Sequence, residues 1–270
     1  IGIAFLNLPQ FTNLLRSEPQ PNSRLSARSL IAAIQLTPEG ILADTTLLLE
    51  GTSDRHQPVL TKPVTVLKSI PAVSPLVAAG TDLSEFWQQV AAGLGNSPLL
   101  DAQLQAFVAT LQQQWGIDLA ADVFRWMRGE FALALVPHAD RPQPDWIFVT
   151  ERSPETDAEL ARLNAIADER GVSNGSFKLG EQEIFAWTRL TPVATATRNP
   201  SRPLGLEATV QGLRATVGNN EIFATSIEAM SQALEAVQNS ITDKPDFKQA
   251  IKALTSRNDG YVYIDWAVLE

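Results

Sequence analysis

Short apolar runs alternate with turn residues along most of the chain. The runs are four to eight residues long and rich in β-branched and aromatic residues, a pattern typical of strands. The turn sequences TPEG (37–40) and GNN (218–220) favour tight connections, so neighbouring strands should be antiparallel. We expect strands in IGIAFLNL, SLIAAIQL, TTLLLE, SPLVAAG, EFALALV, DWIFVTE, EIFAWTRL, LEATVQ, LRATV, EIFATS and YVYIDW.

Amphipathic stretches lie between the strands. Each repeats apolar residues every three or four positions, and most of them follow a residue suited to helix capping. We expect helices after Ser97, Asp118, Ser153 and Ser226, and a further helix around residues 247–254. Each helix has one apolar face that has to pack against another element. The predicted fold class is α+β, with mainly antiparallel sheets built from hairpins and amphipathic helices packed on one face.

The pattern divides the chain into two halves. Residues 1–97 hold strands, a hairpin and short helices, and residues 98–270 form an α+β half. The two halves are also compatible with one continuous domain, because 270 residues bury a sizeable core without a metal or disulfide. The polar stretches 137–144 and 191–203 have strands on both sides, so we expect them to be long, exposed hairpin connections.

One local pattern occurs three times, in IAFLNLPQF, LVAAGTDLSEF and YVYIDWAVL. In each, Asn7, Asp82 or Asp265 follows an apolar strand, which suggests a weak internal repeat of a strand–cap–helix unit. Asn and Asp accept hydrogen bonds from the free N–H groups at helix starts, and Gln10 and Glu85 stand at capping-box positions. We interpret these residues as helix caps rather than as a site.

The segment FRWMRGEFALALV places Arg125, Arg128 and Glu130 between a predicted helix and an apolar strand. Both arginines lie near the helix C-terminus, where cations are favoured, and Gly129 is positioned to end the helix. Glu130 starts the strand and is expected to form a bidentate pair with either arginine. We interpret all three as charges at the rim of the fold.

Candidate chemistry is sparse. His56 and His138 are the two histidines, and Asp140 and Asp145 near His138 lack a metal-ligand spacing, so we predict no metal and no cofactor. The chain contains no Gly-x-Ser-x-Gly elbow, no phosphate-binding loop and no dinucleotide fingerprint. No catalytic residue is therefore predicted, and Glu130 and Asp82 are the weak candidates.

Composition argues against several classes of partner and site. Asp and Glu outnumber Lys and Arg by 30 to 21, and the net charge of −9 argues against nucleic acid and anionic lipid surfaces as partners. The absence of cysteine excludes disulfides, thiol nucleophiles and iron–sulfur clusters. The first residue already lies in an apolar run, so we expect the chain to be a segment of a longer protein.

Several segments resemble an uncharacterised bacterial family, domain of unknown function 3352, which is frequent in cyanobacteria. The first is GIDLAADVFRWMRGEFALALV, and the others are TERSPETDAELARLNAIADERG and LRATVGNNEIFATSIEAMSQAL. The likeness extends over roughly residues 70–265, and the matching residues of the first segment are Asp122, Trp126, Gly129, Glu130, Phe131 and Ala132. The resemblance implies an extracytoplasmic domain behind a membrane anchor, on the periplasmic or thylakoid-lumen side, and implies no reaction or cofactor.

We therefore expect a non-enzymatic domain that binds a protein partner or an apolar ligand and meets the membrane only through a segment outside this chain. A carboxylate-dependent hydrolase or lyase using Glu130 or Asp82 is the competing hypothesis, and it requires two carboxylates to converge in a pocket. A purely architectural spacer is a third alternative that the sequence does not separate from the first.

Overall fold

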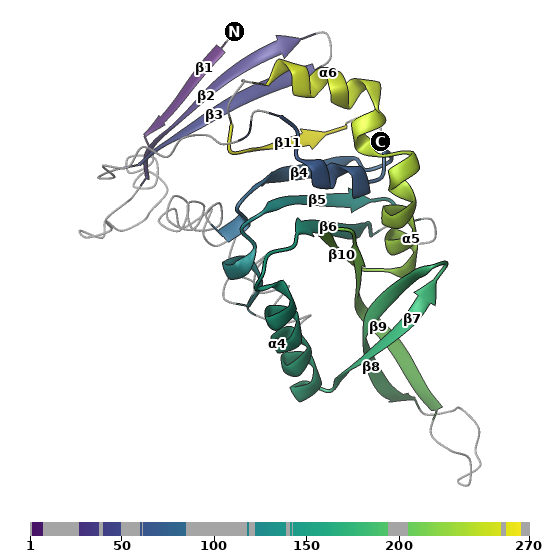
Figure 1. Cartoon of the computed structure of the whole chain (residues 1–270). Coiled ribbons are helices and arrows are strands. Elements are labelled where there is room, and N and C mark those ends of the chain that lie inside the picture. Colours follow the sequence, from purple (N-terminus) through teal and green to yellow (C-terminus); the bar gives the residue numbers. More distant parts are fainter. Residues whose placement is uncertain are drawn as a thin grey trace.

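The computed structural model describes residues 2–7, 27–37, 40–49, 60, 62–84, 118, 122–138, 141, 143–193, 205–254 and 258–265. These residues form two antiparallel sheets, one of three strands and one of eight, together with helices that pack on the larger sheet (Figure 1). The prediction of an α+β fold with mainly antiparallel strands is confirmed.

The smaller sheet is formed by the N-terminal part of the chain. Its strands are β1 (Gly2–Asn7), β2 (Ala27–Thr37) and β3 (Gly40–Leu49), in the order β1-β2-β3. The β2–β3 hairpin closes with Thr37 opposite Gly40, at the position of the predicted TPEG turn. Gly40 has a φ of 142°, which a residue with a side chain rarely adopts.

The larger sheet has the strand order β11-β4-β5-β6-β10-β9-β8-β7, and every neighbouring pair is antiparallel. β4 pairs with both β5 and β11, so this sheet contains strands from either side of residue 97. The strands are β4 (Leu76–Thr81), β5 (Glu130–Val136), β6 (Asp145–Glu151), β7 (Val172–Leu179), β8 (Gln182–Val193), β9 (Gly205–Val217), β10 (Asn220–Ala224) and β11 (Gly260–Ile264).

One face of the larger sheet carries the main core. The short helix η1 (Thr65–Ser69) and the helices α5 (Ile227–Glu235) and α6 (Pro245–Ala253) cover it. Ser226 caps α5 by accepting a hydrogen bond from the Ala229 N–H at 3.0 Å, as predicted. The buried core includes Leu67, Val77, Ala132, Ala134, Ile147, Val149, Ile222, Met230 and Phe247.

The opposite face carries a smaller core under α4 (Thr156–Glu169) and η3 (Phe124–Trp126). Phe131 belongs to this cluster, and Ala132, the next residue along β5, belongs to the main core. Successive residues of a strand point to opposite faces, so the two clusters lie on the two sides of the sheet. The prediction that helices pack on one face holds for α5 and α6, and α4 departs from it.

The β7–β9 region also differs from the sequence-based prediction. β7 was not expected, because most of its positions are polar or glycine and exposed. β9 is one continuous strand, although two were expected, and its register against β8 shifts between Trp187 and Thr188. A Cβ on Gly212 would lie 3.4 Å from the Trp187 ring, so the ring packs against this glycine.

Helix boundaries follow the predictions in part. α4 begins at Thr156, three residues after the predicted Ser153, and Gly171 ends it at a φ of 72°. The helix expected after Ser97 lies outside the described residues, as do Gln10 and Glu85. The predicted repeat of a strand–cap–helix unit is therefore not confirmed. No helix among the described residues is long and apolar enough to cross a membrane.

Candidate functional site

The Glu130 carboxylate binds the first residue of η1 and does not pair with an arginine. Its carboxylate accepts hydrogen bonds from both the backbone N–H and the side chain of Thr65, the latter at 2.7 Å. Thr65 is the first residue of η1, so Glu130 binds N–H and O–H donors at a helix start. The expected bidentate pair with Arg125 or Arg128 was wrong, because η1 comes from a part of the chain 65 residues away.

The two arginines face α4 instead. The Arg125 guanidinium lies 2.9 Å from the Glu159 carboxylate, and the Arg125 side chain is 57% exposed. A hydrogen bond from Ser153 and the charge of Arg128 lower the pKa of Glu155, just before α4. Gly129 does not have the positive φ of a helix terminator. A Cβ there would lie 2.8 Å from the Glu151 Cβ, so close approach explains the glycine.

Asp82 and Asp265 lie at opposite ends of β4. The Asp82 N–H donates to the Gly129 carbonyl at 3.0 Å, whereas the Asp265 N–H donates to the Pro75 carbonyl at 2.7 Å. Asp82 adopts a φ of 52°, a conformation that Asp tolerates better than most residues. The Asp265 carboxylate accepts a hydrogen bond from Lys244. The backbone of Asp82 thus lies near Glu130, but Asp265 does not join them, and Asn7 belongs to the other sheet.

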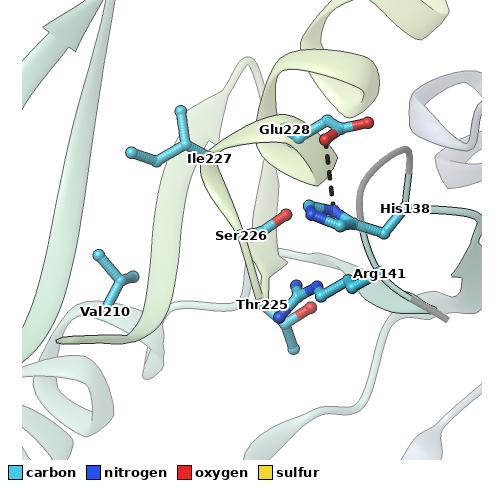
Figure 2. A pocket seen from close by; sticks show the side chains of 7 residues that line it. All are labelled: His138, Arg141, Val210, Thr225, Ser226, Ile227 and Glu228. Carbon is cyan, nitrogen blue, oxygen red and sulfur yellow. Dashed lines mark ion pairs between the residues drawn. The ribbon is translucent and has the colours of Figure 1, made fainter. Parts of the chain in front are cut away.

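A shallow hollow of about 360 Å³ lies where the β5–β6 connection meets the start of α5 (Figure 2). Figure 2 shows the His138 side chain between Ser226 and Glu228, with Arg141 and Thr225 below it. Neither Glu130 nor Asp82 lines this hollow. Its lining residues are His138, Arg141, Val210, Thr225, Ser226, Ile227 and Glu228.

The buried carboxylate of Asp145 organises this cluster. It is 1% exposed and accepts hydrogen bonds from Thr225 at 2.8 Å, Ser226 at 2.7 Å, and Arg141. Burial opposes its ionisation, but the bonds from Ser226 and Thr225 and the charge of Arg141 outweigh burial and lower the pKa of Asp145. Asp145 therefore ties the β5–β6 connection to the β10–α5 junction.

His138 is held on one nitrogen by two carboxylates. Its Nδ1 lies 2.8 Å from Asp145 Oδ2 and 3.3 Å from Glu228 Oε2. A histidine oriented by a buried carboxylate is an arrangement that general bases use. The Ser226 hydroxyl, however, donates to Asp145 and accepts from Ala229, so the three side chains do not form a serine–histidine–acid relay.

The structure gives no metal centre among its described residues. No group of three or more His, Asp or Glu side chains there is arranged to hold an ion. Of the residues considered for metal binding, His56 and Asp140 lie outside the described part. His138 Nδ1 contacts Asp145 Oδ2 directly, at 2.8 Å.

Sequence reasoning missed a second buried carboxylate, Glu221 on β10. It is fully buried and accepts hydrogen bonds from Arg152, from Arg214 at 3.1 Å and from Thr216 at 2.9 Å. The Arg214 guanidinium also lies 4.3 Å from the centre of the Phe185 ring. The alternation of β10, with Glu between Asn220 and Ile222, marks Glu221 as inward-facing only once the neighbouring strands are known.

The three-stranded sheet exposes large apolar side chains on both faces. On one face Ile3 is 78% exposed and Phe5 is 63% exposed. On the other face Leu36 is 80% exposed, and Ile41, directly opposite it across the hairpin, is 70% exposed. Ile34 shares that second face at 41% exposure. We call Ile34, Leu36 and Ile41 the hairpin patch.

The family model described as "Protein of unknown function (DUF3352)" matches residues 1–270, the whole chain. The chain belongs to this family. The DUF3352 match extends beyond the segments that carried the resemblance and includes the three-stranded sheet. No curated protein and no solved structure matches the chain.

The DUF3352 description assigns no reaction, ligand or partner. Two features of the chain bear on its function, which are the structural use of its polar side chains and the exposed apolar residues of its smaller sheet.

Proposed function

We propose that this chain is a non-enzymatic binding domain that holds a protein partner through the hairpin patch. The observation that carries the proposal is the exposure of Leu36 and Ile41, at 80% and 70%, side by side at the end of the β2–β3 hairpin. Contiguous apolar side chains on a surface are costly in water and commonly mark interaction sites.

The contacts of the acidic residues support a binding role over catalysis. Glu130 is bound by Thr65, Asp145 by Thr225 and Ser226, and Glu221 by two arginines. A catalytic acid or base has to reach a substrate proton. These carboxylates instead accept hydrogen bonds from donors of their own chain, as buried polar groups in a structural role do.

The charge of the smaller sheet indicates the chemistry of the partner. Arg28 and Asp44 are the charged residues of its three strands, whereas the whole chain carries a net charge of −9. An uncharged, apolar surface of another protein would fit the hairpin patch without burying unpaired charges.

Site-specific photo-crosslinking in cells of the source organism tests the proposal. A photoreactive residue at Leu36 or Ile41 should give one discrete protein adduct, and the same residue at Ser176, an exposed position on β7, should not. The purified partner should bind the L36K/I41K variant at least about tenfold more weakly, because apolar anchors dominate binding energy. Equal adducts at Ser176, or unchanged affinity, would contradict the proposal.

We also propose that the domain faces away from the cytoplasm and is tethered through a segment outside this chain. The family resemblance supports this location, and the cysteine-free composition does not distinguish between compartments. In intact spheroplasts the tethered protein should be digested by added protease and should pellet with membranes. Protection from the protease until lysis would contradict the location and leave the binding role untouched.

A further inference from the structure

β1 forms an edge of the smaller sheet and lacks the features that usually protect an edge. Its sequence GIAFLN contains no proline and no charge, and its six residues pair with β2 without a bulge. Figure 1 shows it at the outer margin of the molecule, and within the described part of the chain it pairs only with β2. An unprotected, apolar edge readily accepts another strand.

β7, one of the two edge strands of the larger sheet, provides a contrast. Its exposed positions are Ser173, Asn174, Gly175, Ser176 and Lys178, and its two ends meet glycine turns. Polar side chains and a lysine discourage added strands, so β7 has the protection that β1 lacks.

We infer that β1 pairs antiparallel with β1 of a second copy of this chain. In a continuous sheet, a two-fold axis normal to the sheet and passing at Ala4 places Ile3 of each copy opposite Phe5 of the other. Residues directly opposite in a sheet share a face, so the exposed side chains of β1 would cover one another. Aromatic and β-branched residues are favourable cross-strand partners.

Charge does not oppose a second copy at this edge, although it does over the rest of the surface. With a net charge of −9, two copies repel each other over most of their surfaces. β1 carries no charged residue, so this edge contributes no repulsion of its own to the contact. The pairing is also self-complementary, because the open edge of one copy meets the identical edge of the other. The hairpin patch takes no part in it, so this inference stands apart from the proposed partner.

Charge-swapped variants test the pairing. I3K/F5K and I3E/F5E should each lower self-association, with a dimer dissociation constant raised by about tenfold or more, because like charges oppose each other at both cross-strand positions. An equimolar mixture of the two variants should restore dimers, now mixed. Sedimentation velocity over a dilution series measures this, and N174K/S176K on β7 is the matched control that should behave as the wild type.

Cysteine pairing provides a second readout that does not depend on the charged variants. The chain has no cysteine, so single I3C and F5C variants report only on this edge. Mild oxidation of their mixture should give disulfide-linked I3C–F5C dimers. Disulfides formed only within I3C or only within F5C, no disulfide at all, or a monomeric wild type would overturn the inference. A monomer that still gives the crosslink at Leu36 would overturn this pairing and leave the proposed function intact.

Discussion

The two sheets of this molecule differ in how far their apolar side chains are buried. The larger sheet buries them under α5 and α6 on one face and under α4 on the other, and it surrounds two buried carboxylates with donors. The smaller sheet leaves Ile3, Phe5, Leu36 and Ile41 mostly exposed. From this difference we infer that burial on the larger sheet stabilises the fold, whereas the exposed apolar side chains of the smaller sheet are free to contact a partner.

The largest expected effect on stability is the difference between substitutions of two phenylalanines, one in each sheet region. Phe247 is buried on α6, so F247A should lower the free energy of unfolding by about 3–5 kcal/mol through lost packing and a cavity. Phe5 is mostly exposed on β1, so F5A should change the free energy of unfolding of the dilute, monomeric chain by less than about 0.5 kcal/mol. Urea unfolding of both variants measures the pair. Similar losses in the two would show that the smaller sheet is also part of the core.

The buried carboxylate of β10 should come next. E221Q removes the charge that Arg152 and Arg214 face, and we expect a loss of about 2–4 kcal/mol because two cations are left without their counter-ion. E207Q, at an exposed position of β9, is the matched control and should be nearly neutral. A neutral E221Q would mean that the arginines find other partners.

Asp145 should make the free energy of unfolding depend on pH. Its pKa is lowered in the folded state, so its stabilisation is present above the unfolded value of about 3.9 and is lost as the pH falls through the folded pKa. D145N should therefore cost about 1–3 kcal/mol near neutral pH, and the gap to the wild type should shrink below about pH 4. Thermal unfolding across pH measures it, with D246N at an exposed position of α6 as the control. A gap that stays constant with pH would argue against the ionised state of Asp145 as the cause.

The smallest effect on stability is expected at the hairpin patch. L36K/I41K should leave the free energy of unfolding within about 0.5 kcal/mol of the wild type, because both side chains are exposed. The same variant should bind less of a dye that fluoresces on apolar surfaces, while V237K, at an exposed valine near α5, should lose less. A large destabilisation would place the hairpin patch inside the fold.

Local patterns predicted most of the larger sheet. β4, β5, β6 and β10 are runs whose apolar character is visible without any partner, and Ser226 followed by an apolar stripe identified α5. The GNN turn placed β9 beside β10, with Gly218 at a φ of 58°. β7 was not predicted, because an exposed edge strand with polar residues lacks a periodic pattern of apolar residues.

The polar clusters were harder to predict, because their members are far apart in sequence. His138, Arg141 and Asp145 are close enough along the chain to be noticed together. Thr225 and Ser226, however, lie between β10 and α5, 80 and 81 residues beyond Asp145. The partner of Glu130 was predicted from nearby arginines, whereas the fold brings in Thr65. Strand pairing decides such contacts, and no local rule contains it.

The place of β11 has a consequence for synthesis. β11 completes the larger sheet by pairing with β4, yet the two strands come from distant parts of the chain. As the chain leaves the ribosome, β4 can pair with β5 early. Its other edge stays without its partner strand β11 until residues 260–264 have been synthesised. Premature termination before that point would release a nearly complete sheet with β4 as an unpaired edge strand, and we expect chaperones that bind nascent chains to recognise it.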